Sequence, residues 1–225
     1  MTILSHLTHL NNRIAAYEQK YQRSPGSVRL LAVSKNQSIE NILAAFQAGQ
    51  TCFGESYLQE ALPKMAALTH LPIEWHFIGP LQSNKTKKIA EHFAWVHSVD
   101  TLRIAQRLHE QRPVHLPPLN ICLQVNMSAE SSKSGISVSE LLPLATACLA
   151  LPRLNLRGLM TIPALETDFK KQRAAFHQLS VAWQTLRAQG FPLDTLSMGM
   201  SADFEAAIAE GSTLVRIGSA VFSSR

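Results

Sequence analysis

Short apolar segments alternate with amphipathic segments along this 225-residue chain, and this alternation constrains the fold more than any other feature. Eight of the apolar segments are short and bounded by polar or turn residues, which predicts buried strands. Most are apolar at successive positions, so we expect both faces of each strand to be covered. The predicted strands are Leu30–Ser34, Thr51–Gly54, Glu74–Ile78, Trp95–Val99, Asn120–Val125, Leu156–Ile162, Thr195–Met198 and Leu214–Ile217.

Helical periodicity fills the intervals between these strands, and one more helix precedes them. Glycine follows three of the helix patterns at Gly49, Gly190 and Gly211, where it is expected to end the helix. The predicted helices are Leu4–Tyr21, Ile39–Ala48, Tyr57–Leu68, Asn84–Phe93, Leu102–Glu110, Val138–Ala150, Phe169–Gln189 and Ala202–Ala209.

The number of elements predicts an α/β fold, a single (β/α)8 TIM barrel with an extra N-terminal helix. The alternative, an open doubly wound sheet, would need fewer strands. It would also place a glycine-rich dinucleotide motif after the first strand, where this chain reads Ser34-Lys35-Asn36-Gln37. We therefore expect one barrel domain over residues 1–225, with short loops and no second domain.

Composition limits the classes of partner. Hydrophobic residues make up 46% of the chain and charged residues 16%, which is typical of a globular protein. The formal net charge is +5, but the basic residues are scattered. Their densest group, Lys85, Lys87 and Lys88, is interpreted as a solvated helix face, so we predict no nucleic-acid partner.

Targeting signals and cysteines point to the cytoplasm. No segment has the length and apolarity of a membrane span or the pattern of a secretory signal. The three cysteines, Cys52, Cys122 and Cys148, fit neither a disulfide framework nor a metal-binding motif. We interpret them as small core residues in a reducing compartment, and we predict no membrane partner and no metal.

Lys35 is the first candidate functional residue. It follows the apolar run of the first strand, at the carboxyl end where barrels assemble their sites. A lysine in this position is expected to lie half in an apolar environment, and its amine can form a Schiff base with an aldehyde. On its position alone, the better interpretation is a lysine that reaches solvent from a strand end.

The loops after the seventh and eighth strands are candidate phosphate sites, because barrels often bind phosphate there. Gly199 allows a tight turn, and Ser201 is predicted to cap the helix that follows. Gly218 and Ser219 follow the last strand and offer backbone N–H groups and a hydroxyl. Ordinary capping or turn formation explains either loop alone, whereas two such loops together favour a phosphate site.

Arg216 lies inside the apolar last strand, and a buried charge needs a partner. One alternative is a salt bridge with a carboxylate such as Glu55. The other is a ligand, because pyridoxal 5′-phosphate (PLP) needs a Schiff-base lysine, a phosphate site and a partner for its ring nitrogen. Lys35, the two loops and Arg216 supply all three.

Several stretches of the chain are typical of one known family, and together they span almost its whole length. They are LLAVSK (30–35), FGESYLQE (53–60), EWHFIGPLQSNK (74–85), VHSVD (96–100), SKSGI (132–136), LRGLMTIPA (156–164) and LSMGMSADFEAAIAEGSTLVRIGSAVF (196–222). In these stretches the chain resembles the bacterial pyridoxal phosphate homeostasis proteins, an alanine racemase-like PLP-binding family of fold type III.

The resemblance implies a barrel that carries PLP covalently on Lys35, with Arg216 near the ring nitrogen. It implies phosphate contacts around Ser201, Gly218 and Ser219. Met198, Gly199 and Ser56 are also expected among the cofactor-binding residues. The family usually reads FGENY at the second strand, so Ser56 replaces an asparagine, and its hydroxyl can still form hydrogen bonds.

The family resemblance and the residues together favour binding over catalysis. No second acid or base is evident: His76 and His97 are interpreted as core or strand-end histidines, and Lys133 as a solvated loop lysine. An arginine partner also leaves the ring nitrogen largely unprotonated, which weakens PLP as an electron sink. We therefore expect a monomeric PLP-binding protein that stores, buffers or delivers PLP, with transient contact to PLP-dependent apo-enzymes.

Two alternatives stay open. The first is a weak amino-acid racemase of the same fold type. The second is a barrel enzyme that acts on a phosphorylated substrate and uses Lys35 as an aldolase-type Schiff-base lysine.

Overall fold

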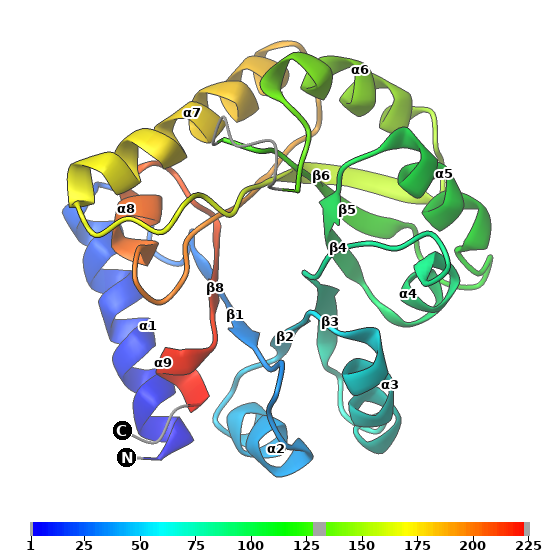
Figure 1. Cartoon of the computed structure of the whole chain (residues 1–225). Helices are drawn as coiled ribbons and strands as arrows, with labels where there is room; N and C mark the ends of the chain where they lie inside the picture. Colours follow the sequence, from blue (N-terminus) through cyan, green and yellow to red (C-terminus); the bar gives the residue numbers. More distant parts are fainter. Residues whose placement is uncertain (1, 128–133, 223–225) are drawn as a thin grey trace.

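In the computed structural model, which describes residues 2–127 and 134–222, eight parallel strands close into a barrel in chain order (Figure 1). The described helices surround the strands. The strands are β1 (Arg29–Val33), β2 (Cys52–Glu55), β3 (Glu74–Phe77), β4 (Trp95–Val99), β5 (Leu119–Gln124), β6 (Leu154–Met160), β7 (Thr195–Ser197) and β8 (Leu214–Ile217). The helices are α1 (Ile3–Lys20), α2 (Ile39–Gln47), α3 (Leu58–Ala67), α4 (Thr86–His92), α5 (Leu102–Gln111), α6 (Val138–Leu149), α7 (Phe169–Ala188), α8 (Phe204–Ala209) and α9 (Ser219–Phe222).

The predicted fold class is therefore confirmed, and so are the three glycine helix stops. Gly49, Gly190 and Gly211 have φ angles of 95°, 91° and 97°, which an L side chain rarely adopts. Each stands directly after the C-cap residue of its helix. The short helix α9 was not predicted, because its four residues are too few to show a period.

The core has an outer and an inner part. The outer part is the largest cluster, in which the outward side chains of the strands pack against the helices. The inner part consists of two small apolar groups that come from strands or strand ends, inside the barrel. One contains Leu31, Cys52 and Leu214, and the other contains Trp95, Cys122 and Met160. Polar side chains fill other positions of the interior. This is unusual, because branched aliphatic side chains dominate the interior of a typical barrel.

The barrel closes between its first and last strands. β8 pairs with β1 in parallel, with Leu31 opposite Arg216 and Ala32 opposite Ile217. Helix α1 runs beside α9 in Figure 1, and the His6 ring Nδ1 lies 3.0 Å from the Val221 carbonyl oxygen. This closure brings the carboxyl end of β1 next to the loop that follows β8.

Within the described part of the chain, no helix combines the length and the apolarity that crossing a membrane requires. Cys52, Cys122 and Cys148 are all buried and free of disulfides.

Candidate functional site

Lys35 lies in a tight turn just beyond β1. The Gln37 N–H donates to the Ser34 carbonyl oxygen at 3.0 Å, and Asn36 has a φ of 61°. The Lys35 side chain is exposed, whereas the sequence analysis expected it half in an apolar environment. The reason is that the chain turns away at Ser34 instead of continuing the strand. The amine is therefore accessible from solvent at the carboxyl end of the barrel.

A buried ion pair holds the base of this turn. Lys64 Nζ on α3 donates to the Ser34 carbonyl oxygen at 2.8 Å and to Glu55 Oε1 at 2.9 Å. The Ser34 hydroxyl also donates to Glu55 Oε1, at 2.6 Å. Burial raises the pKa of the Glu55 carboxyl, and the bonds from Ser34 and Lys64 oppose that rise. On the other side of the turn, the Asn36 N–H donates to Glu60 Oε2 at 3.0 Å.

Arg216 is almost fully buried inside the barrel and does not pair with Glu55, so the salt-bridge alternative is wrong. Its Nη1 donates to the Ser197 hydroxyl oxygen and its Nη2 to the Thr161 carbonyl oxygen, both at 2.8 Å. Glu55 is bound to Lys64 instead. Burial lowers the pKa of Arg216 to about 10, so the guanidinium remains protonated at neutral pH.

The loops after β7 and β8 meet. The Ser219 hydroxyl donates to the Ser201 hydroxyl oxygen at 3.0 Å, which joins the two candidate phosphate loops. Ser201 does not cap α8, contrary to the prediction. Asp203 is the N-cap residue, and its Oδ1 accepts from the Met200 N–H at 2.6 Å. The Ser201 hydroxyl is therefore not occupied by the helix and faces the second loop.

Two glycines allow close approaches in these loops. At Gly199, where φ is 99°, a Cβ would lie 2.6 Å from the Ala207 Cβ, so no larger residue fits. At Gly218, a Cβ would lie 3.1 Å from the carbonyl oxygen of Val33. Gly218 therefore sits against the last residue of β1, and the β8 loop lies beside the turn that carries Lys35.

Ser56 and Met198 hold different positions. Ser56 is partly exposed at the end of β2, and its carbonyl oxygen is so close to Gly79 that a Cβ there would collide with it. The Met198 side chain is fully buried in the outer core. The Met198 N–H donates to the Leu214 carbonyl oxygen at 3.1 Å, and the Met198 carbonyl oxygen accepts from the Ser212 hydroxyl at 2.7 Å.

The donor set fits PLP. An exposed primary amine, two hydroxyls on loops that meet, and a protonated guanidinium all lie at or below the same end of the barrel. These groups match an aldehyde, a phosphate and a ring nitrogen. Lys133 lies outside the described residues.

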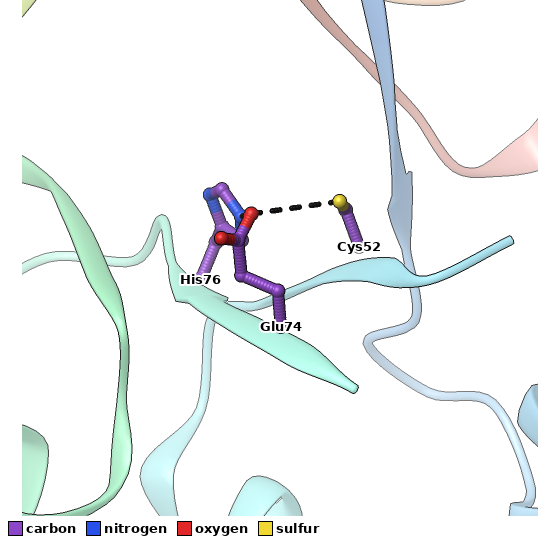
Figure 2. A group of neighbouring side chains, drawn as sticks. All are labelled: Cys52, Glu74 and His76. Carbon is purple, nitrogen blue, oxygen red and sulfur yellow. Dashed lines mark hydrogen bonds and ion pairs between the residues drawn. The ribbon is translucent and has the colours of Figure 1, made fainter. Parts of the chain in front are cut away.

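A second cluster lies at the other end of the barrel interior. Figure 2 shows Glu74 and His76 side by side on β3, with Cys52 on β2 facing them. Their potential ligand atoms all lie within 4.8 Å of one another, as a metal site would require. However, Arg29 Nη2 is 2.7 Å from both Cys52 Sγ and Glu74 Oε1. The guanidinium already supplies the positive charge there, so we assign no metal to this cluster.

Comparison with known proteins gives consistent matches. A family model described as alanine racemase, N-terminal domain, matches residues 5–225. A pyridoxal phosphate homeostasis protein of Pseudomonas aeruginosa is 55% identical over 224 residues, which cover 100% of this chain and 96% of that protein.

Solved structures agree. PipY of Synechococcus elongatus, in a structure with PLP bound, is 36% identical with a TM-score of 0.83, and the match covers 99% of this chain and 100% of PipY. The alanine racemase of Corynebacterium glutamicum is 17% identical with a TM-score of 0.70, and the match covers 96% of this chain and 60% of the racemase. That second likeness shows a common fold alone.

Proposed function

Because the chain belongs to the pyridoxal phosphate homeostasis protein family, within the wider family of alanine racemase N-terminal domains, we propose that it binds PLP and stores, buffers or delivers it in the cell. The observation that carries the proposal is the junction of β1 and β8. There the exposed Lys35 stands beside the Gly218–Ser219 loop, above the buried Arg216. A structure of the relative PipY holds PLP, which supports the same ligand here.

Each group has a role that its chemistry supports. The Lys35 amine condenses with the aldehyde of PLP and releases water. The Ser201 and Ser219 hydroxyls and the N–H groups of the β8 loop donate to the phosphate. Arg216 donates a hydrogen bond to the ring nitrogen and orients the ring. Ser56 and Gly199 complete the proposed surroundings of the cofactor, and Met198 supports them from the outer core.

The environment of Arg216 favours binding over catalysis. When bound, PLP withdraws electrons from an attached amino acid, most strongly when its ring nitrogen is protonated. A guanidinium with a pKa of about 10 keeps its own protons at neutral pH and shares one as a hydrogen bond. The exposed Lys35 also suits exchange of PLP with solution. The relatives are named as homeostasis proteins rather than as enzymes, and absence of turnover in this chain is part of the proposal.

Further parts of the proposal concern the whole protein. We place it in the cytoplasm as a monomer of one barrel domain that contacts PLP-dependent apo-enzymes transiently. Three buried cysteines without disulfides are consistent with a reducing compartment.

Reduction with borohydride tests the proposed attachment. The purified protein is loaded with PLP and reduced, and its peptides are mapped by mass spectrometry. We expect the pyridoxyl group on Lys35 and its loss in Lys35→Ala. Lys85→Ala, which changes the lysine at the N-cap of α4, is the control and should keep the adduct. An adduct found mainly on another lysine would contradict the assignment.

A further inference from the structure

Five side chains form an unbroken hydrogen-bond chain through the barrel interior. Glu74 Oε1 lies 2.9 Å from His76 Nε2, and His76 Nδ1 lies 2.9 Å from His97 Nε2. His97 Nδ1 lies 2.9 Å from the Ser197 hydroxyl oxygen, which accepts from Arg216 Nη1 at 2.8 Å. The residues come from β3, β4, β7 and β8. The chain therefore links the cluster of Figure 2 to the guanidinium under the proposed cofactor.

The charges at the two ends fix the directions of the first and last hydrogen bonds. Glu74 is a carboxylate, because the hydrogen bond to His76 and the charge of Arg29 lower its pKa. It can only accept, so His76 carries its proton on Nε2. Arg216 can only donate, so the Ser197 oxygen accepts from it and the Ser197 O–H remains to donate to the next group.

The two histidines between these ends are neutral. Both are fully buried, and burial lowers the pKa of each. The His76 Nδ1 is then an acceptor, so His97 must donate from Nε2. The His97 Nδ1 in turn accepts from the Ser197 hydroxyl. One arrangement satisfies every atom: both histidines are Nε2–H tautomers, and all four donors point from Arg216 toward Glu74.

We propose that Glu74, His76, His97 and Ser197 are positioning residues, which hold Arg216 in place and fix its orientation for the ring nitrogen of PLP. This inference rests on the proposed function. A buried guanidinium without acceptors would turn toward other polar groups or toward water. The Ser197 hydroxyl and the Thr161 carbonyl oxygen each accept one N–H, from Nη1 and Nη2, which fixes the orientation of the guanidinium and leaves other N–H groups for a ligand. The negative charge of Glu74 stabilises this arrangement from the far end of the barrel.

The histidine tautomers test the chain without any cofactor. Nitrogen-15 NMR of the protein without PLP should show His76 and His97 as neutral Nε2–H tautomers. Glu74→Gln should then alter His97, which Glu74 does not contact. The amide can donate to His76, so the whole chain can reverse, and the Nδ1–H tautomer of His97 becomes populated. Cys122→Ala, a fully buried change inside the barrel but off the chain, should leave both tautomers unchanged.

An Nδ1–H tautomer of His97 in the unsubstituted protein would overturn the proposed direction. An unchanged His97 in a folded Glu74→Gln variant would overturn the coupling along the chain. The tautomers of the unsubstituted protein remain decisive if the variant does not fold.

PLP binding tests whether the hydrogen-bond chain positions Arg216. Ser197→Ala removes the acceptor of Arg216 Nη1 and should weaken PLP affinity by about tenfold, because a hydrogen bond to a charged group is lost. It should also shift the absorption band of bound PLP. Cys122→Ala, which likewise removes one buried side-chain atom, should change neither. Equal affinity and equal spectra for both variants would overturn the positioning role. If the unsubstituted protein does not bind PLP, the proposed function fails. The histidine tautomers still decide whether the hydrogen-bond chain from Arg216 to Glu74 exists.

Discussion

At the scale of single residues, the proposed site joins two cations with opposite surroundings. Lys35 is exposed, and Arg216 is almost fully buried with two acceptors of its own. An amine that must form and break a covalent bond with a ligand from solution needs access. A group that only orients the ligand needs rigidity, which burial and fixed hydrogen bonds provide.

The two loop hydroxyls should share the phosphate. We expect Ser201→Ala and Ser219→Ala each to weaken PLP affinity by about tenfold or more, because each removes one charge-assisted hydrogen bond of ~1.5–3 kcal/mol. The double variant should bind more weakly than either. Equilibrium dialysis measures the affinities. Backbone N–H groups remain, so binding should persist, and a double variant with unchanged affinity would remove these hydroxyls from the site.

Several site residues could be predicted from the sequence because each carries a local signal. Lys35 ends an apolar run, and Arg216 is a charge inside one. The partners of Arg216 could not be predicted in this way. Ser197 and His97, which are 100 positions apart along the chain, become neighbours only when the barrel closes. His97 alone resembles an ordinary core histidine.

At the scale of elements, α3 supports the turn that carries Lys35. Its Lys64 reaches the ends of both β1 and β2 and is buried, as is its partner Glu55. The sequence analysis missed Lys64 because a lysine in an amphipathic helix is normally assigned to the solvated face. The available signal was the spacing of Glu60 and Lys64, which are four residues apart on one helix. In the structure, Lys64 Nζ lies 3.8 Å from Glu60 Oε2.

Removing this lysine should destabilise the fold strongly. Lys64→Met leaves the Glu55 carboxylate buried without its cation, which costs ~3–5 kcal/mol in the free energy of unfolding. Lys88→Met is the matched control, because its ion pair with Glu91 on α4 is exposed and is worth roughly 1 kcal/mol or less. Urea unfolding of both variants measures the difference, and equal losses would contradict the importance of the buried pair.

The loss of unfolding free energy in Lys64→Met should depend on pH. Burial already raises the pKa of Glu55 above its ordinary value, and the variant lacks the opposing lysine. A carboxyl whose pKa is higher in the folded state stabilises the fold below its unfolded pKa. That stability is lost as the pH rises through the folded pKa. We therefore expect Lys64→Met to be closer to the unsubstituted protein at about pH 5 than at about pH 8. The opposite trend in urea unfolding would show that Glu55 stays charged in the variant.

The predicted strands lie within about two residues of the observed ones, because apolar runs mark buried strands well. β4 and β8 have the predicted bounds, whereas β6 begins at Leu154 rather than Leu156. The polar Asn155 interrupts the apolar run there, and only the pairing with β5 in the folded barrel makes Leu154 and Asn155 part of the strand. Helix α8 begins at Phe204 rather than Ala202 because Asp203, not Ser201, takes the cap position.

At the scale of the whole molecule, Lys35 and Ser219 are open to solvent at the carboxyl end of the barrel, in the part of the chain that the structure describes. An enzyme that stabilises a carbanion on PLP generally excludes water from it, whereas a carrier has to release its ligand.

We therefore expect the PLP-loaded protein to hand PLP to an apo-enzyme that requires it, measured as recovered activity of that enzyme. Turnover of amino acids should stay far below the roughly 1–10³ per second of typical enzymes. The Lys35→Ala protein is the control for transfer. Turnover in the enzymatic range would restore the racemase alternative, and an absence of transfer would limit the role to storage or buffering.

The closure between β1 and β8 has a consequence for synthesis on the ribosome. Lys35 is synthesised long before Arg216, Gly218 and Ser219, because it follows the first strand of the barrel and they belong to the last strand and its loop. Until β8 takes its place beside β1, a nascent chain has the reactive amine but neither the arginine nor the last loop. Specific capture of the vitamin B6 coenzyme is thus expected only after β8 has been synthesised and has paired with β1.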